Sequence, residues 1–151
     1  MRAVRGFCRI DALGKVTGEA QYPGDFNYAN QAHAKILFAR RPHAVITRLD
    51  TSKAEALDGV LLVLTAKDVP VNEYGLIMPD QPVFCGPGSS KPFAERVRFV
   101  GDQIAMVIAE NEAIAAEARD LIEVDYEVLP VYVDPLAAMQ PGASLLHPDI
   151  D

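Results

Sequence analysis

The chain has 151 residues and a mass of 16.4 kDa, the size of a single domain, and 50% of its residues are hydrophobic. Its 14 basic and 21 acidic side chains give a net charge of −7, which argues against nucleic acid or an anionic membrane as partner. No apolar run approaches the length of a membrane span, and residues 1–9 lack the apolar core of a secretory signal, so we expect a cytoplasmic protein.

The first half of the chain predicts a loop followed by strands. Residues up to 25 are rich in glycine and charge and predict a loop with one short turn. Residues 33–40 are apolar on both faces, which predicts a central strand that ends before Pro42, and residues 44–49 predict a second strand. Ser52 and Glu55 have the spacing of a capping box, so a short helix is expected there, ending near Gly59.

The middle of the chain predicts one buried strand and then a long loop. Residues 60–65 are rich in Leu and β-branched side chains, which favours a buried strand, and residues 65–68 predict one helical turn ended by Pro70. From residue 71 to 95 no periodic pattern is found. Loops of this length within a domain usually serve a function or an interface. Prolines and glycines break this segment at Gly75, Pro79, Pro82, Gly86, Pro87, Gly88 and Pro92.

The second half of the chain returns to regular structure. Residues 96–100 and 103–109 predict strands around a turn at Gly101-Asp102, as a hairpin or as one kinked strand. Asn111 is a favourable N-cap for the helix that follows, and residues 122–128 alternate as a half-exposed strand. A short helix is expected at 135–139, and no pattern continues beyond residue 141. The fold class is therefore mixed α/β, which we assign as α+β, with one mixed sheet and two or three packed helices.

The residues offer no metal site. Cys8 and Cys85 lie far apart, and an iron–sulfur cluster needs four thiolates. His33, His43 and His147 show no ligand spacing with one another or with the cysteines. We therefore expect two free thiols and no metal bound by this chain.

Other candidate sites are weak as well. Residues 85–91 resemble a phosphate loop only faintly, because Pro92 follows Lys91 and no helix opens there. Glu123 and Asp125 lie on the polar face of a strand, which favours a solvated surface over a catalytic pair. One basic cluster is favoured as an ordinary surface patch over a contact to an acidic partner; it comprises Arg40, Arg41 and Arg48.

Two separated segments carry a family resemblance: RIDALGKVTGEAQYPGD at 9–25 and VRFVGDQIAMVIAE at 97–110. The chain resembles the N-terminal a/b hammerhead domain of the molybdenum-binding subunit of the xanthine dehydrogenase and aldehyde oxidase (molybdenum hydroxylase) family. The resemblance implies a lead at 1–8, the hammerhead domain at 9–146 and the start of a linker at 147–151. Further matching stretches are 42–46, 49–54, 58–60, 64–70, 113–120 and 124–130.

The resemblance also implies cofactors and partners. The parent enzyme would use a molybdopterin-type molybdenum cofactor, [2Fe–2S] clusters and FAD, while this chain would bind none of them. Its partners would be the molybdenum-cofactor domains of the same subunit and the iron–sulfur and FAD subunits or domains. A homo-oligomer is a further expected partner, since the surface that meets the missing domains would be apolar.

The same resemblance places a substrate-channel contact in the long loop. In xanthine dehydrogenases a glycine followed by two apolar residues lines the channel mouth, and Gly75-Leu76-Ile77 occupies the corresponding place, with Met78 beside it. Leu76 and Ile77 are therefore the candidate site residues. The alternative is that both side chains anchor the loop by packing under the domain.

The sequence predicts no catalytic residue. We expect a structural and substrate-entrance domain of a molybdenum-dependent oxidoreductase that is inactive as an isolated chain. The alternative is a separately encoded assembly module that docks on a molybdenum-cofactor subunit. A small independent enzyme is least favoured, because no acid–base or nucleophile pair is found.

Overall fold

The computed structural model describes residues 9–150, and the chain divides into two units, Met1–Gln31 and Ala32–Asp151. The first unit contains the helical turn α1 (Ala12–Val16) and the 3-10 turn η1 (Pro23–Asp25), where one short turn was expected. None of its described residues is buried. Its turns are therefore held by local bonds, such as the one from the Tyr22 amide to Asp25 Oδ2 at 2.8 Å.

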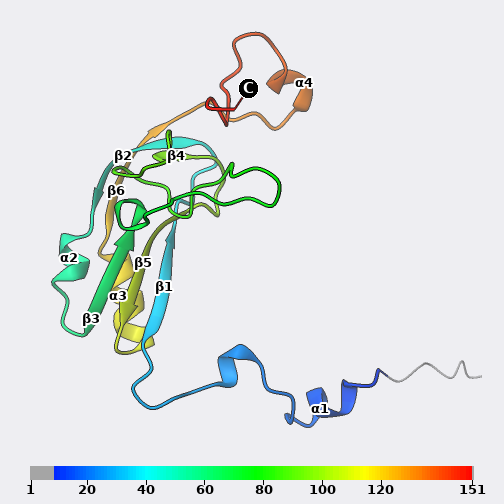
Figure 1. Cartoon of the computed structure of the whole chain (residues 1–151), viewed down its shortest axis with the longest axis vertical. Helices are drawn as coiled ribbons and strands as arrows, with labels where there is room; N and C mark the ends of the chain where they lie inside the picture. Colours follow the sequence, from blue (N-terminus) through cyan, green and yellow to red (C-terminus); the bar gives the residue numbers. More distant parts are fainter. Residues whose placement is uncertain (1–8, 151) are drawn as a thin grey trace, which may run out of the picture. The chain divides into compact units, whose positions relative to one another are not determined.

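The second unit is built on two small antiparallel sheets (Figure 1). Sheet A has the order β1-β5-β3, with β1 at His33–Phe38, β5 at Gln103–Ala109 and β3 at Val60–Thr65. Sheet B has the order β4-β2-β6, with β4 at Arg96–Val97, β2 at Ala44–Asp50 and β6 at Glu123–Val128. The predicted fold class is confirmed, but the single mixed sheet is replaced by two antiparallel ones.

The turn after β4 explains why there are two sheets. The Asp102 carboxylate accepts from the amides of Arg98 at 2.5 Å and Phe99 at 3.2 Å, which bends the chain sharply. β4 therefore pairs with β2, whereas β5 pairs with β1 and β3. The predicted hairpin or kinked strand is wrong, and its first strand is only two residues long.

Two strands lie at positions that their composition did not predict. β1 was expected to be central but forms an edge of sheet A, and β3 was expected to be buried but forms the other edge. Leu61 and Leu62 of β3 are 57% and 48% exposed. The apolar character of β1 comes from packing and not from a central position in the sheet. Its Leu37 packs against both clusters of buried hydrophobic residues that form the core of the unit.

The helices begin at polar caps. For α3 (Glu112–Asp120) the predicted cap is confirmed, because Asn111 Oδ1 accepts from the Ile114 amide at 2.9 Å. For α2 (Ser52–Glu55) the predicted capping box is wrong, since Asp50 Oδ1 accepts from both the Ser52 amide at 3.0 Å and the Ser52 hydroxyl at 2.6 Å. These bonds from Ser52 lower the pKa of Asp50 below its usual value.

The remaining helical elements are short. A 3-10 turn, η2 (Ala66–Asp68), follows β3, as predicted. α4 (Pro135–Ala138) is capped by Asp134, whose carboxylate accepts from the Leu136 amide at 2.9 Å. Within residues 9–150 no helix has the length and apolar character needed to cross a membrane.

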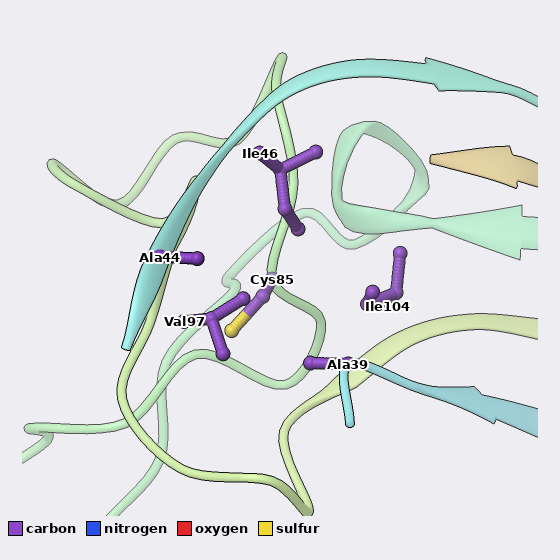
Figure 2. Packing of buried hydrophobic residues seen from close by; sticks show 6 residues of the cluster. All are labelled: Ala39, Ala44, Ile46, Cys85, Val97 and Ile104. Atoms are coloured by element: carbon purple, nitrogen blue, oxygen red, sulfur yellow. The ribbon is translucent and has the colours of Figure 1, made fainter. Parts of the chain in front are cut away.

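The core of the second unit has two adjoining clusters. In one, α2 and α3 pack against sheet A through Ala54 and Ala118. In the other, the long loop contributes Cys85, and Figure 2 shows its sulfur next to Val97 and surrounded by the other cluster residues. The members of this second cluster are Ala39, Ala44, Ile46, Cys85, Val97 and Ile104.

The Cys85 thiol is expected to resist alkylation in the folded chain. Cys85 is 1% exposed, and burial, with the nearby Asp102 charge, raises the pKa of its thiol far above the usual range. In a Cys8→Ser variant, which removes the cysteine outside the described residues, we expect iodoacetamide to label Cys85 at least about 100-fold more slowly in buffer than in 8 M urea. Equal rates in the two solvents, measured by mass spectrometry, would contradict this burial.

Candidate functional site

The long loop contains a small hairpin that sequence patterns did not reveal. Tyr74 and Gln81 form an antiparallel bridge, with amide-to-carbonyl distances of 2.8 Å and 3.2 Å in the two directions. Inside it, the Asp80 amide donates to the Met78 carbonyl at 2.9 Å. These bonds define a hairpin loop, residues 74–81, which extends away from the two sheets (bright green in Figure 1).

The tip of the hairpin loop presents apolar side chains to solvent. Leu76 and Ile77 are 105% and 100% exposed, and Met78 is 51% exposed. Side chains this exposed do not pack under the domain within the described part of the chain, so the alternative of buried loop anchors does not hold there. An exposed apolar tip on a closed hairpin is accessible to another molecule or domain.

Gly75 allows the tight closure of this tip. A Cβ atom at this position would lie 1.8 Å from the Met78 carbonyl oxygen and 2.8 Å from its carbon. No side chain fits at that distance, and the obstacle is backbone rather than a flexible side chain. Position 75 therefore requires glycine for a structural reason, which is the close approach of the backbone at residues 75 and 78.

Asn72 holds the base of the loop. Its side chain is fully buried, and Nδ2 donates to the Phe84 carbonyl at 2.8 Å and to Ser89 Oγ at 2.7 Å. In return, the Phe84 amide donates to Asn72 Oδ1 at 2.9 Å. One side chain thus replaces the hydrogen bonds of a strand partner and ties both arms of the loop together.

Lys91 is a second buried polar anchor. Its side chain is 6% exposed, and Nζ donates to the Pro79 carbonyl at 3.1 Å. The same ammonium lies 3.8 Å from a carboxylate oxygen of Glu73 and 3.6 Å from one of Asp149. The sequence indicated Lys91 only as the lysine of a faint phosphate-loop pattern. Its role as an anchor was not predicted, because its partners lie in separate parts of the chain.

A cavity of about 430 Å³ lies next to sheet B. His43 lines it but is committed to the fold, since Nδ1 lies 2.8 Å from the Pro130 carbonyl and Nε2 lies 3.4 Å from the Arg96 guanidinium. Because the Pro130 carbonyl can only accept and the guanidinium can only donate, these two contacts fit the tautomer with its proton on Nδ1. The cavity is mostly apolar, and its lining includes Pro42, Arg98, Pro130, Val131, Tyr132, Leu145, Leu146 and His147.

The charged groups singled out from the sequence form surface networks. Arg48 pairs with Asp50 at 2.6 Å and lies 3.4 Å from Glu123 and 3.6 Å from Asp125. Lys53 also pairs with Glu123 and is the main cause of the lowered pKa of that carboxyl. These pairs are exposed, so they favour a solvated strand face over an acid–base site.

The metal-ligating side chains of the described residues lie apart from one another. Between residues 9 and 150, no three His, Cys, Asp or Glu side chains come together as metal ligands do. Cys8 lies outside the described residues. Of the histidines, His43 and His147 line the same cavity, whereas His33 begins β1.

Comparison with known proteins places this geometry among large oxidoreductases. Residues 17–130 match the family described as aldehyde oxidase and xanthine dehydrogenase, a/b hammerhead domain. The chain is 45% identical over 142 residues to a probable xanthine dehydrogenase subunit of Bacillus subtilis, covering 93% of this chain and 18% of the relative. It is 38% identical over 143 residues to the carbon monoxide dehydrogenase large chain of Afipia carboxidovorans, covering 94% of this chain and 17% of the relative.

A solved structure shows the same fold. The crystal structure of a Cu,Mo-CO dehydrogenase superposes with a TM-score of 0.81 at 36% identity, covering 95% of this chain and 18% of that one. The chain thus spans less than a fifth of the length of these similar proteins. They share the hammerhead region with it and contain several hundred residues more.

Proposed function

This chain belongs to the a/b hammerhead family of aldehyde oxidases and xanthine dehydrogenases, and from that premise we propose that it is the structural and substrate-entrance domain of a molybdenum hydroxylase large subunit. Most of the length of the similar proteins lies outside the region that matches this chain, so the catalytic chemistry would belong to that remaining part. A molybdenum cofactor held in the remaining part would supply the redox chemistry. Within this proposal, the chain alone is inactive.

Exposed apolar residues support the role of a docking domain. Beyond the hairpin loop, the segment from β6 to the C-terminus leaves large apolar side chains in solvent, including Val133 at 95% and Met139 at 80%. A stable isolated domain rarely exposes so many. The proposed partners are the molybdenum-cofactor part of the same subunit, iron–sulfur and FAD subunits or domains, and a second copy of the chain. Other exposed members of this surface are Val128, Leu136, Leu145 and Leu146.

The hairpin loop is the proposed wall of the substrate entrance, and the exposure of Leu76 and Ile77 is the observation that carries this proposal. A hairpin closed at Gly75 and anchored at Asn72 and Lys91 holds these two side chains at a defined place. Apolar side chains around an aromatic substrate exclude water and orient the ring. Their role is to position and not to react.

A chimera tests the proposal. The matching segment of the Bacillus subtilis relative is replaced by this chain, and the holoenzyme is assayed with that enzyme's own heterocyclic substrate. We expect activity to be retained, and a Leu76→Ser/Ile77→Ser variant to raise KM about tenfold with a small change in kcat, since binding surface is lost without loss of reacting groups.

A matched pair of exposed leucines provides the control. Leu61→Ser/Leu62→Ser makes the same kind of change on the outer strand β3, where both side chains are about half exposed. This variant is expected to keep the KM of the unsubstituted chimera. The entrance role is rejected if the two double variants have the same KM, and the domain role is rejected if the chimera assembles without activity.

A further inference from the structure

The C-terminal segment, residues 145–150, is held on the body of the domain by side chains from residues 91–98. Arg96 Nη1 donates to the Leu145 carbonyl at 2.8 Å, and Arg98 Nε donates to the Leu146 carbonyl at 2.9 Å. The Asp149 side chain is 15% exposed and lies 3.6 Å from Lys91 Nζ and 4.0 Å from the Arg98 guanidinium. This attachment is polar, because it consists of two hydrogen bonds to backbone carbonyls and of ion pairs to one carboxylate.

Lys91 contacts both the C-terminal segment and the hairpin loop. Its ammonium donates to the carbonyl of Pro79, which lies inside the hairpin loop, and forms an ion pair with Asp149. Its third partner, Glu73, stands just before the loop and is 41% exposed. A buried ammonium needs compensating charge. A change at Asp149 is therefore felt at Pro79 through the single cation that they share.

We propose that Lys91 is a positioning residue that couples the C-terminal segment to the hairpin loop. With Asp149 in place, the ammonium stays where it binds the Pro79 carbonyl and holds the loop. Without the Asp149 charge, the remaining carboxylate is the solvated Glu73, and the ammonium moves toward it and releases Pro79. The functional meaning of this coupling rests on the proposed entrance role of the hairpin loop.

Amide hydrogen exchange on the full chain tests the coupling. The amides of Tyr74 and Gln81 are hydrogen-bonded across the base of the hairpin loop, so their exchange reports its opening. We expect both Asp149→Asn and Lys91→Met to accelerate exchange of the peptide covering the loop, on the order of tenfold. The double variant Lys91→Met/Asp149→Asn is expected to exchange no faster than Lys91→Met alone, since the two residues act through one interaction.

Two references make the result specific. Exchange in the central strand β5 is expected to change less than twofold, and Glu123→Gln, which removes an exposed carboxylate on β6, is expected to leave the loop unchanged. The coupling is overturned if Asp149→Asn leaves loop exchange within twofold of the original chain. It is also overturned if β5 accelerates to the same extent as the loop, or if the two single effects add.

The exchange readout is independent of the entrance role. Coupling observed together with an unchanged KM for Leu76→Ser/Ile77→Ser would retain Lys91 as a positioning residue and reject the entrance proposal. The reverse result, a raised KM without coupled exchange, would retain the entrance and reject the coupling.

Discussion

Asn72→Ala is expected to destabilise the domain by about 2–5 kcal/mol, because it leaves two backbone groups of Phe84 without partners in a buried site. Each unsatisfied buried donor or acceptor costs about 1–3 kcal/mol. Ser89 also loses the donor to its hydroxyl oxygen. The loss is measured by urea unfolding, followed by far-UV circular dichroism.

Asn72→Asp keeps the hydrogen bond that residue 72 accepts from Phe84 and removes the one that it donates to Phe84. The carboxylate still accepts from the Phe84 amide, but it has no N–H to donate to the Phe84 carbonyl and repels it instead. We expect a loss of similar size to that of Asn72→Ala. Asn27→Ala serves as the control, because Asn27 is exposed and makes only a 3.4 Å contact to the Asp25 carbonyl. Stability of Asn72→Ala within about 0.5 kcal/mol of the control would show that water replaces the lost bonds.

Ile104→Ala is expected to cost about 3–5 kcal/mol, toward the upper end for this kind of substitution. Ile104 is fully buried near the start of β5, and its neighbours in the cluster include Ala39 and Ala44, which are too small to fill a cavity. Ile104→Val should cost only about 0.5–1.5 kcal/mol, since it removes one methyl group. Both values come from urea unfolding with an unchanged slope against denaturant.

An exposed isoleucine gives the matched control for this series. Ile77→Ala removes the same atoms from a fully exposed side chain and is expected to change the free energy of unfolding by less than about 0.5 kcal/mol. If Ile104→Ala cost no more than Ile77→Ala, the cluster around Cys85 would not be part of the folding core.

Local signals predicted the elements whose causes lie within a few residues. Asn111 caps α3 as its type and position indicate, and Pro135 opens α4. The alternation of residues 122–128 predicted β6, and the family resemblance placed the exposed pair Leu76 and Ile77 in the long loop. The caps and the strand are decided by contacts or preferences of residues close together in the chain, whereas the exposed pair was found through a family motif.

Other features depended on contacts between distant residues. The capping box at Ser52 is an exception, since it failed through a local competition: Asp50, two residues earlier, accepts from Ser52 in its place. Asn72 and Lys91 are ordinary polar residues in a loop until Phe84 and Asp149 come within reach. The predicted domain boundary at residue 146 stays a prediction.

The sequence by itself determined the family of this protein, the order of its helices and strands and the loop that carries the candidate site. The tertiary structure decided which strands pair, which of them become edges, and which polar side chains are buried. The physical reason is that strand periodicity records which residues are apolar but not which partner covers them. Sheet order and buried polar anchors arise only when segments far apart in the chain meet.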